Sequence, residues 1–332
     1  MGFSGSVASM LANAFANAND ENEAKIEKKS EVEPMQKEKE EPKKASKQLD
    51  EILSKLPPEI SKYAKKKLTE VIDYEPRIGV MGKTGVGKSS LCNAIFQQQV
   101  CAVSHVEACT RTIEELQIDV GGRKLTIVDL PGVGESKERD IEYRALYEEQ
   151  IPKLDLVLWV IKADDRVLGP DEDFYHNVIK PLNAETKILF VISQADKIEP
   201  SFEWDRDKNR PSSTQFDNLE IREAYIYDRL FENNNGCVAV SSGYSYNIDK
   251  LVKKMVLRLP SKSKAGVYST LKQEHKTEEV KAEAKKGLND TVKEVLGHVI
   301  DSAPIPSFLK EPAKQAVNYV CNAISSLFDR WF

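Results

Sequence analysis

The spacing of hydrophobic residues changes repeatedly between residues 76 and 259 of this chain. Short, continuous apolar runs alternate with stretches in which apolar residues recur at helical intervals. A short continuous run is typical of a buried strand, and the second spacing is typical of an amphipathic helix. Strands are therefore predicted at 77–81, 113–120, 123–130, 154–161, 187–193 and 237–241, with helices near 89–97, 138–150, 171–182, 218–231 and 247–258. This alternation predicts an α/β fold with a mostly parallel sheet and helices on both of its faces.

One pair of predicted strands is joined only by Gly121 and Gly122. Two glycines readily form the tight turn of a β-hairpin, because both can adopt positive φ angles. The strands 113–120 and 123–130 should therefore pair in opposite directions. We expect this pair to give the sheet one antiparallel edge strand.

Both ends of the chain differ from this central region. Residues 1–47 are rich in Lys and Glu with few large apolar side chains, so we expect a disordered or loosely helical charged segment. Residues 48–75 show a helical pattern with a break at two consecutive prolines, which predicts a helical lead-in to the central domain, 76–259. Residues 260–332 carry two amphipathic patterns that predict a helical C-terminal extension. Its apolar stripes fit packing on the rest of the chain, an oligomer or partner interface, or contact with a membrane surface.

The composition is that of an ordinary soluble protein with a formal net charge of −5. This balance does not indicate a protein that binds nucleic acid by neutralising phosphates. The five cysteines have no paired spacing, which favours a reducing compartment without disulfides. Cys101, His105 and Cys109 lack a fourth ligand and lie in an expected mobile switch, so a zinc site is not expected. With neither a secretory signal nor a membrane-spanning apolar run, the chain is expected to be cytoplasmic, although Met1 to Ser6 fits a myristoylation pattern.

The strongest chemical signal is the run from Gly82 to Ser89, Gly-Lys-Thr-Gly-Val-Gly-Lys-Ser. It joins a predicted strand to a predicted helix, which is the setting of a phosphate-binding loop. The glycines let backbone N–H groups converge on phosphates, Lys88 would reach the β- and γ-phosphates, and Ser89 would bind Mg²⁺. The chain is therefore predicted to bind a nucleoside triphosphate. The residues expected to contact it, in this loop and in two later segments, are Gly82, Lys83, Thr84, Gly85, Val86, Gly87, Lys88, Ser89, Ser90, Gln194, Asp196, Ser241 and Ser242.

A second element, Asp129-Leu130-Pro131-Gly132, follows a predicted strand at the distance expected of a D-x-x-G motif. Asp129 would hold Mg²⁺ through water, and the N–H of Gly132 would contact the γ-phosphate. Thr110 is the expected switch residue that completes Mg²⁺ coordination in the triphosphate state, with Thr112 as the alternative. The predicted metal ligands are thus Ser89, Thr110 and Asp129, and the predicted catalytic residues are Lys88, Thr110 and Gly132.

The base-reading residues are expected after the last two predicted strands. Asp196, within Ser193-Gln194-Ala195-Asp196-Lys197, can accept hydrogen bonds from both N1–H and the exocyclic amine of guanine. Adenine does not offer these donors in the same arrangement. Ser241-Ser242-Gly243 would present backbone N–H groups to the guanine O6. GTP is therefore favoured over ATP.

In the order of these motifs, residues 76–259 resemble the G domain of the translation-factor-related small GTPases. Thr110-Arg111 resembles the switch of the Era-like family, and the chain looks like the Era-like GTPases of bacterial prophage and defence islands. The phosphate loop is also similar to those of septin-like and immunity-associated GTPases, which pair through their G domains. The resemblance implies a G-domain fold, Mg²⁺, and hydrolysis of GTP to GDP and phosphate.

Several positions depart from these families. Ser193 and Gln194 replace the first two residues of the usual N-K-x-D base motif, which predicts weaker base stacking and weaker support of the loop. Gly85 stands where potassium-stimulated relatives have asparagine, so potassium stimulation is not implied. Val133 stands where Ras-type enzymes have a water-orienting glutamine. Slow turnover that a partner or dimerisation accelerates is therefore expected.

These residues favour a GTP-hydrolysing, nucleotide-dependent switch that acts on an unknown effector. A homodimer across the nucleotide face would let Arg111 or Arg139 of one copy act in the site of the other. Two alternatives stay open, a septin-like GTPase that assembles or associates with membranes, and a ribosome or RNA assembly factor. Residues 260–332 contain no G-x-x-G loop of the kind that clamps RNA in KH domains, which disfavours the last alternative.

Overall fold

The computed structural model describes residues 42–56, 58–97, 100–108, 111–132, 137–165, 168–230, 236–302 and 306–332. The Gly2 pattern and most of the charged N-terminal segment lie outside these residues. Helix α2 (Pro42–Leu53) includes residues 42–47, the last part of the segment predicted to be disordered or loosely helical. Leu49 and Leu53 of this helix are buried against other helices, and such packing stabilises a helix whose sequence alone would not.

The centre of the molecule is a seven-stranded sheet made of β1 (Arg77–Met81), β2 (Val100–Ala108), β3 (Arg111–Val120), β4 (Arg123–Asp129), β5 (Leu156–Lys162), β6 (Ile188–Ser193) and β7 (Cys237–Ala239). The strand order is β2-β3-β4-β1-β5-β6-β7. All neighbours from β4 to β7 pair in parallel, whereas β3 runs antiparallel to β2 and β4. Gly121 and Gly122 form the expected turn, both with positive φ. The predicted fold class, a mostly parallel sheet with one antiparallel strand, is confirmed.

The edge of the sheet differs from the prediction. The antiparallel strand β3 is covered by β2, and β2 occupies the edge. The interpretation of this segment as part of a mobile switch is wrong for residues 100–108. Three valines, at 100, 103 and 106, favour an extended conformation, and the open edge of β3 offers a row of backbone groups to pair with.

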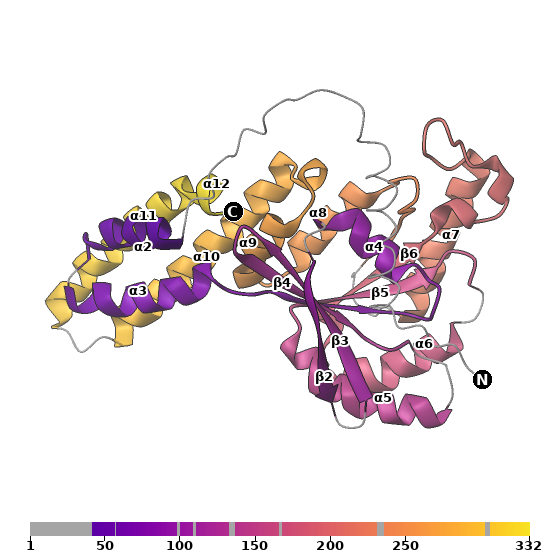
Figure 1. Ribbon diagram of the computed structural model, residues 1–332, viewed down its shortest axis with the longest axis horizontal. Helices are drawn as coiled ribbons and strands as arrows, with labels where there is room; N and C mark the ends of the chain where they lie inside the picture. Colours follow the sequence, from indigo (N-terminus) through magenta and orange to yellow (C-terminus); the bar gives the residue numbers. More distant parts are fainter. Residues whose placement is uncertain are drawn as a thin grey trace, which may run out of the picture.

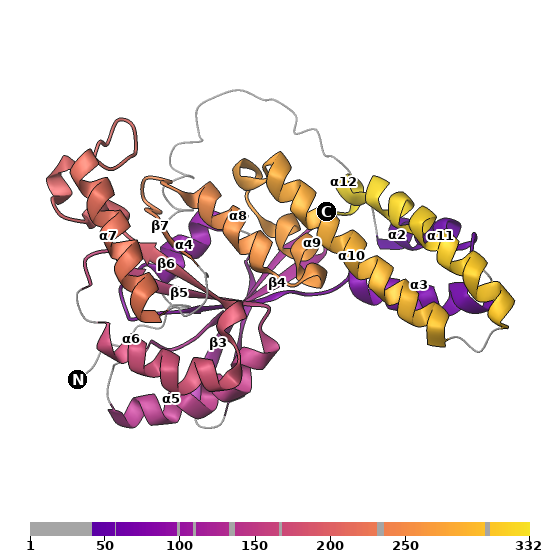
Figure 2. The ribbon, with the colours of Figure 1, turned by 180° about the vertical axis from the view of Figure 1, so that it is seen from behind.

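Helices cover both faces of the sheet (Figures 1 and 2), namely α4 (Lys88–Ile95), α5 (Lys137–Gln150), α6 (Gly169–Phe174), α7 (Ser213–Leu230) and α8 (Ile248–Arg258). On one face α4 and α8 bury residues such as Leu91 and Leu251. On the other face α5, α6 and α7 bury Tyr147, Phe174 and Ile226. The central strands β5 and β6 are apolar along almost their whole length, because both of their faces are covered.

Helix α9 (Ser261–Thr270) carries no apolar stripe, so the sequence pattern does not predict it. Most of its residues are nevertheless buried. A Cβ at Gly266 would lie 2.7 Å from Pro76 Cγ, and one at Gly287 of α10 (Glu278–Ser302) would lie 2.9 Å from the Ser261 carbonyl oxygen. Close packing of small residues, rather than hydrophobic periodicity, therefore holds α9 between the entry to β1 and helix α10.

The two ends of the described chain pack together in what we call the terminal helical assembly, formed by α2, α3 (Pro58–Ile72), α10, α11 (Ser307–Ser326) and α12 (Phe328–Trp331). It projects to the left in Figure 1. Leu53, Ile60 and Ile324 come from opposite ends of the sequence and are buried in one apolar core that continues to α8. In the part of the chain that the structure describes, no helix is long and apolar enough to cross a membrane.

Candidate nucleotide site

The phosphate loop lies where β1 ends and α4 begins, as the sequence predicts. Its three glycines have positive φ angles, 142° at Gly82, 81° at Gly85 and 92° at Gly87. A Cβ at Gly82 would lie 2.3 Å from the carbonyl oxygen of Val160 on β5, so the loop also needs glycine for close approach. Helix α4 has no side-chain cap at its N-terminus. Its first amide groups are therefore left for a ligand, and a phosphate suits the start of such a helix.

Lys88 places its ammonium inside this loop. Nζ donates a hydrogen bond to the Gly82 carbonyl oxygen over 2.6 Å and lies 4.0 Å from Asp129 Oδ1. The side chain is only 9% exposed, so its charge is held within the loop. Ser89 follows on the first turn of α4 and is half-buried. These positions suit a phosphate-binding lysine and a hydroxyl ligand of Mg²⁺.

The other predicted loop residues serve the loop in different ways. Val86 is buried beneath it, whereas Thr84 and Ser90 are exposed. Lys83 directs its ammonium away from the loop, to Asp165 Oδ2 at 2.8 Å and Asp171 Oδ2 at 3.4 Å. The side chain of Lys83 is thus engaged with the segment after β5, and its backbone is what remains near the phosphates.

Asp129 ends β4 and lies next to Val80 in the register with β1. Among the described residues, its Oδ1 is buried without a hydrogen-bond partner. Burial raises the pKa of this carboxyl to about 6, the charge of Lys88 opposes the increase, and Glu114 adds to it. A buried carboxylate oxygen without a donor suits a cation or the water shell of one. The residues present therefore fit the Mg²⁺ that the resemblance implies.

Gly132 packs directly against the phosphate loop. A Cβ at this position would lie 2.8 Å from the Gly82 carbonyl oxygen and 2.9 Å from Lys83 Cα, so a side chain would displace one element from the other. The hydroxyl of Tyr147 on α5 donates a hydrogen bond to the carbonyl oxygen of Pro131 and holds the preceding residue. Several predicted residues lie outside the description, namely Thr110 and Val133 entirely and the side chains of Arg111, Thr112 and Arg139. Their roles stay predictions.

The two residues that depart from the usual base motif both bond to the phosphate loop. Ser193 Oγ donates to the Val86 carbonyl oxygen over 2.6 Å, and Gln194 Nε2 donates to the Gly85 carbonyl oxygen over 3.0 Å. The two substituted residues therefore still support the phosphate loop, and the weaker base stacking stays a prediction. The end of β6 lies so close to the loop that a short hydroxyl and an amide can reach it.

Asp196 is held by a partner that the sequence analysis assigned a different role. Ser241 Oγ donates to Asp196 Oδ1 over 2.5 Å, while the Ser241 N–H donates to the Tyr246 carbonyl oxygen over 3.2 Å. The expected contact of the Ser241 N–H with guanine is thus replaced by a contact within the protein. Ser242, which is half-buried in the following turn, keeps its place as the candidate backbone donor to O6.

Asp165 and Asp171 are two polar residues of this region that sequence reasoning missed. Asp171 accepts a hydrogen bond from Trp159 Nε1 over 3.0 Å and is buried, and burial raises its pKa while Lys83 lowers it. Both acids follow β5, and the carboxyl ends of neighbouring parallel strands meet at one edge of a sheet. Polar residues directly after a buried strand were the signal that could have found them.

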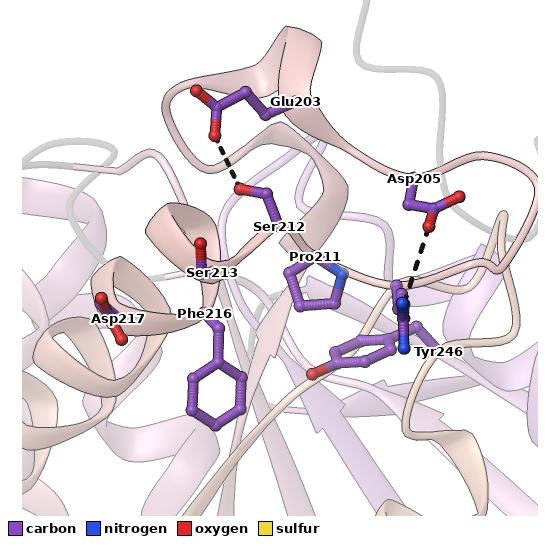
Figure 3. Close-up of a pocket in the computed structure, with 9 residues that line it drawn as sticks. Glu203, Asp205, Pro211, Ser212, Ser213, Phe216, Asp217 and Tyr246 are labelled. Carbon is purple, nitrogen blue, oxygen red and sulfur yellow. Dashed lines mark hydrogen bonds and ion pairs between the residues drawn. The ribbon is translucent and has the colours of Figure 1, made fainter.

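A cavity of about 660 Å³ lies beside the base-reading segment (Figure 3). It shares Tyr246 with the turn that carries Ser241, so it borders the nucleotide site. Ser212 Oγ donates to Glu203 over 2.8 Å, and Asp205 lies 3.7 Å from the guanidinium of Arg210. Because these carboxylates already have partners, we do not assign the cavity to the nucleotide.

Comparison with known proteins agrees with this geometry. Residues 77–194 match the protein family described as 50S ribosome-binding GTPase. The matched span runs from β1 through the phosphate loop and the D-x-x-G element to Gln194. The fold and the site thus define a P-loop GTPase domain, and the predicted enzyme class, a GTP-hydrolysing enzyme, is confirmed.

The chain belongs to the family of two proteins of Escherichia coli strain K12. It is 40% identical to YkfA over 281 residues, which cover 85% of this chain and 94% of YkfA. It is 39% identical to YfjP over 279 residues, which cover 84% of this chain and 94% of YfjP. GTPase Era of Aquifex aeolicus is 30% identical over 128 residues, or 37% of this chain and 42% of Era. The resemblance to Era is confirmed within the GTPase domain.

Proposed function

We propose that this protein is a GTP-dependent switch in which a G domain of residues 76–259 passes its nucleotide state to the terminal helical assembly. The observation that carries the proposal is the course of β4. This strand ends in the nucleotide site at Asp129 and begins, at Arg123, in contact with the terminal helical assembly. A displacement of β4 at Asp129 would therefore also move Arg123 and the terminal helices that it contacts.

Arg123 makes four contacts with segments from both ends of the chain. Its guanidinium donates to the Ile72 carbonyl oxygen, to Asp73 Oδ1 over 3.0 Å and to the Trp331 carbonyl oxygen over 3.1 Å. It also lies 4.6 Å from the centroid of the Phe332 ring. The Arg123 side chain is only 15% exposed, so its bonds to the two carbonyl oxygens are shielded from bulk water, whereas the Asp73 carboxylate is 65% exposed.

The chemistry proposed for the site follows from the same residues. Lys88 and the amides of the phosphate loop bind the β- and γ-phosphates, Ser89, Thr110 and Asp129 hold Mg²⁺, and Asp196 reads guanine. When bound, Mg²⁺ neutralises charge that develops on the phosphoryl oxygens. The N–H of Gly132 would contact the γ-phosphate, and Thr110 would complete Mg²⁺ coordination only in the triphosphate state, so loss of the γ-phosphate releases the segments that carry both residues.

Hydrogen exchange of residues 317–331 in the GDP-bound and GTP-analogue-bound protein tests the switch. We expect the two states to differ in the wild type and the difference to disappear in Arg123→Gln, with nucleotide affinity unchanged. Of the contacts that Arg123 makes, Phe332→Ala removes only the one with this ring, so it should reduce the difference between the two states less than Arg123→Gln does. Lys124→Ala is the matched control, because this neighbour is 40% exposed and pairs at the surface with Glu75. Identical exchange in both nucleotide states of the wild type would contradict the proposal.

We further propose that a second copy accelerates hydrolysis across the nucleotide face. The proposal is supported by Val133 in place of a water-orienting residue and by a phosphate loop that resembles those of GTPases that pair. Arg111 or Arg139 of the second copy would supply a cation, a contribution that reaches factors on the order of 10³. Turnover per molecule should then rise with protein concentration, and a transition-state mimic should induce dimers in sedimentation. Flat specific activity without dimers would rule this out.

A further inference from the structure

The base-reading loop contains a chain of hydrogen bonds that extends beyond the nucleotide residues assigned above. Lys197 Nζ donates to Gln194 Oε1 over 2.7 Å, and Gln194 Nε2 donates to the Gly85 carbonyl oxygen over 3.0 Å. Both ends of one amide group are thus occupied. The backbone of Gln194 has a positive φ of 55°, which turns this side chain out of line with β6 and toward the phosphate loop.

The chain of hydrogen bonds reaches the phosphate loop at Gly85, an exposed residue. Gly85 has a φ of 81°, and a Cβ placed on it would meet no atom within 4 Å. Its carbonyl oxygen is held by Gln194, while the buried Ser193 hydroxyl holds the next carbonyl, that of Val86. These two bonds join the loop that reads the base to the loop that holds the phosphates.

Lys197 strengthens the first of these bonds. A cation bound to the amide oxygen draws electron density from the amide nitrogen, and a more polarised N–H is a better donor. Lys197 and Gln194 together place a cation and a donor where the usual base motif has a single lysine. The ammonium of Lys197 therefore acts on the Gly85 carbonyl oxygen through the Gln194 amide, and it does not contact that oxygen itself.

We propose that Lys197 is a positioning residue for guanine nucleotides, acting through Gln194 on the phosphate loop. The inference rests on the proposed nucleotide site and adds to it a residue outside the base-reading carboxylate. Lys197 does not touch the nucleotide in this role. Its removal should loosen the link between the two loops and speed nucleotide release.

A double-mutant cycle tests the relay with the full-length protein and fluorescent GDP and GTP analogues. We expect Lys197→Ala to raise the dissociation rate about fivefold, because the hydrogen bond it removes is exposed to solvent, and by the same factor for both nucleotides. Gln194→Lys would present its own ammonium to Gly85. In that background the further change Lys197→Ala should cause no loss, because the relay is no longer used.

Two controls separate this role from a general effect on the fold. Lys208→Ala removes a lysine of the same region that is 65% exposed and lies 3.9 Å from Asp205, and it should leave dissociation unchanged. Lys197→Arg should keep most of the wild-type rate. The melting temperature of the nucleotide-free protein should stay the same in all variants.

The outcomes distinguish the relay from the site itself. If Lys197→Ala speeds release equally in the wild type and in Gln194→Lys, the relay is wrong while the nucleotide site stands. An unchanged rate in Lys197→Ala also overturns the relay. If the wild type binds neither GDP nor GTP, the proposed function fails and the relay fails with it.

Discussion

The candidate nucleotide site has a phosphate side, around Lys88, and a base side, around Asp196. The aspartates on these two sides lie in opposite surroundings. Asp129, on the phosphate side, has a buried oxygen without a hydrogen-bond partner among the described residues and a pKa raised to about 6. Asp196, on the base side, accepts a 2.5 Å hydrogen bond from Ser241. The first carboxylate is left for a ligand, whereas the second is positioned before any ligand binds. The buried, unpartnered carboxylate of Asp129 thus lowers the stability of the ligand-free protein, whereas the hydrogen-bonded carboxylate of Asp196 does not.

The largest expected effect falls on the phosphate side. Lys88→Ala should weaken GTP binding about a hundredfold, because charged hydrogen bonds of this kind contribute about 3 kcal/mol. Isothermal titration calorimetry measures it. Lys83→Ala is the control, since this lysine of the same loop pairs with Asp165 and Asp171. An equal loss of GTP affinity in Lys88→Ala and Lys83→Ala would contradict the assignment of phosphate binding to Lys88 alone.

Because Asp129 destabilises the protein only when it is ionised, the free energy of unfolding of the metal-free, nucleotide-free protein should depend on pH. Its folded pKa, about 6, lies above the ordinary value of 3.8, so the unfolded state releases its proton first. The free energy of unfolding contributed by this group therefore falls as pH rises from about 4 to 6 and stays low above that range. Asp129→Asn should raise the free energy of unfolding at pH 7.5 by about 3 kcal/mol and change it little at pH 4.

Chemical denaturation in the presence of a chelator gives this measurement. Asp173→Asn, at an exposed position of α6, is the control and should leave the free energy of unfolding unchanged at both pH values. The same variant of Asp129 should lose magnesium-dependent turnover, so stability and activity move in opposite directions. A loss of stability in Asp129→Asn at pH 7.5 would contradict the comparison between the two aspartates.

The smallest effect is expected on the base side. Ser241→Ala removes one hydrogen bond to Asp196 and should raise the Kd for GDP about fivefold, the effect of about 1 kcal/mol. Because Asp196 would then be less fixed, discrimination against xanthine nucleotides should also weaken. Ser242→Ala keeps the backbone N–H and serves as the control. If Ser242→Ala has the larger effect, its hydroxyl rather than that of Ser241 acts in the site.

The agreement between sequence and structure differs from one element to another. The phosphate loop and the D-x-x-G element were predicted because their chemistry lies in consecutive residues, such as Gly82 to Ser89. The strand β2 was missed because its pairing depends on the edge that β3 exposes. Helix α9 was missed because its burial comes from the close approach at Gly266 and Gly287, which leaves no periodic signal.

The sequence by itself determined the parallel sheet and the place of the phosphate loop, and it singled out Asp196 as the candidate base-reading carboxylate. These features depend on residue type and on spacing within short segments, where local conformation decides. Only the tertiary structure decided that Ser241 holds Asp196, that Lys197 reaches Gly85 through Gln194, and that Arg123 joins β4 to both ends of the chain. Apart from the bond between Lys197 and Gln194, these contacts join residues far apart in the sequence, and such side-chain donors meet their acceptors only after the strands and helices have packed.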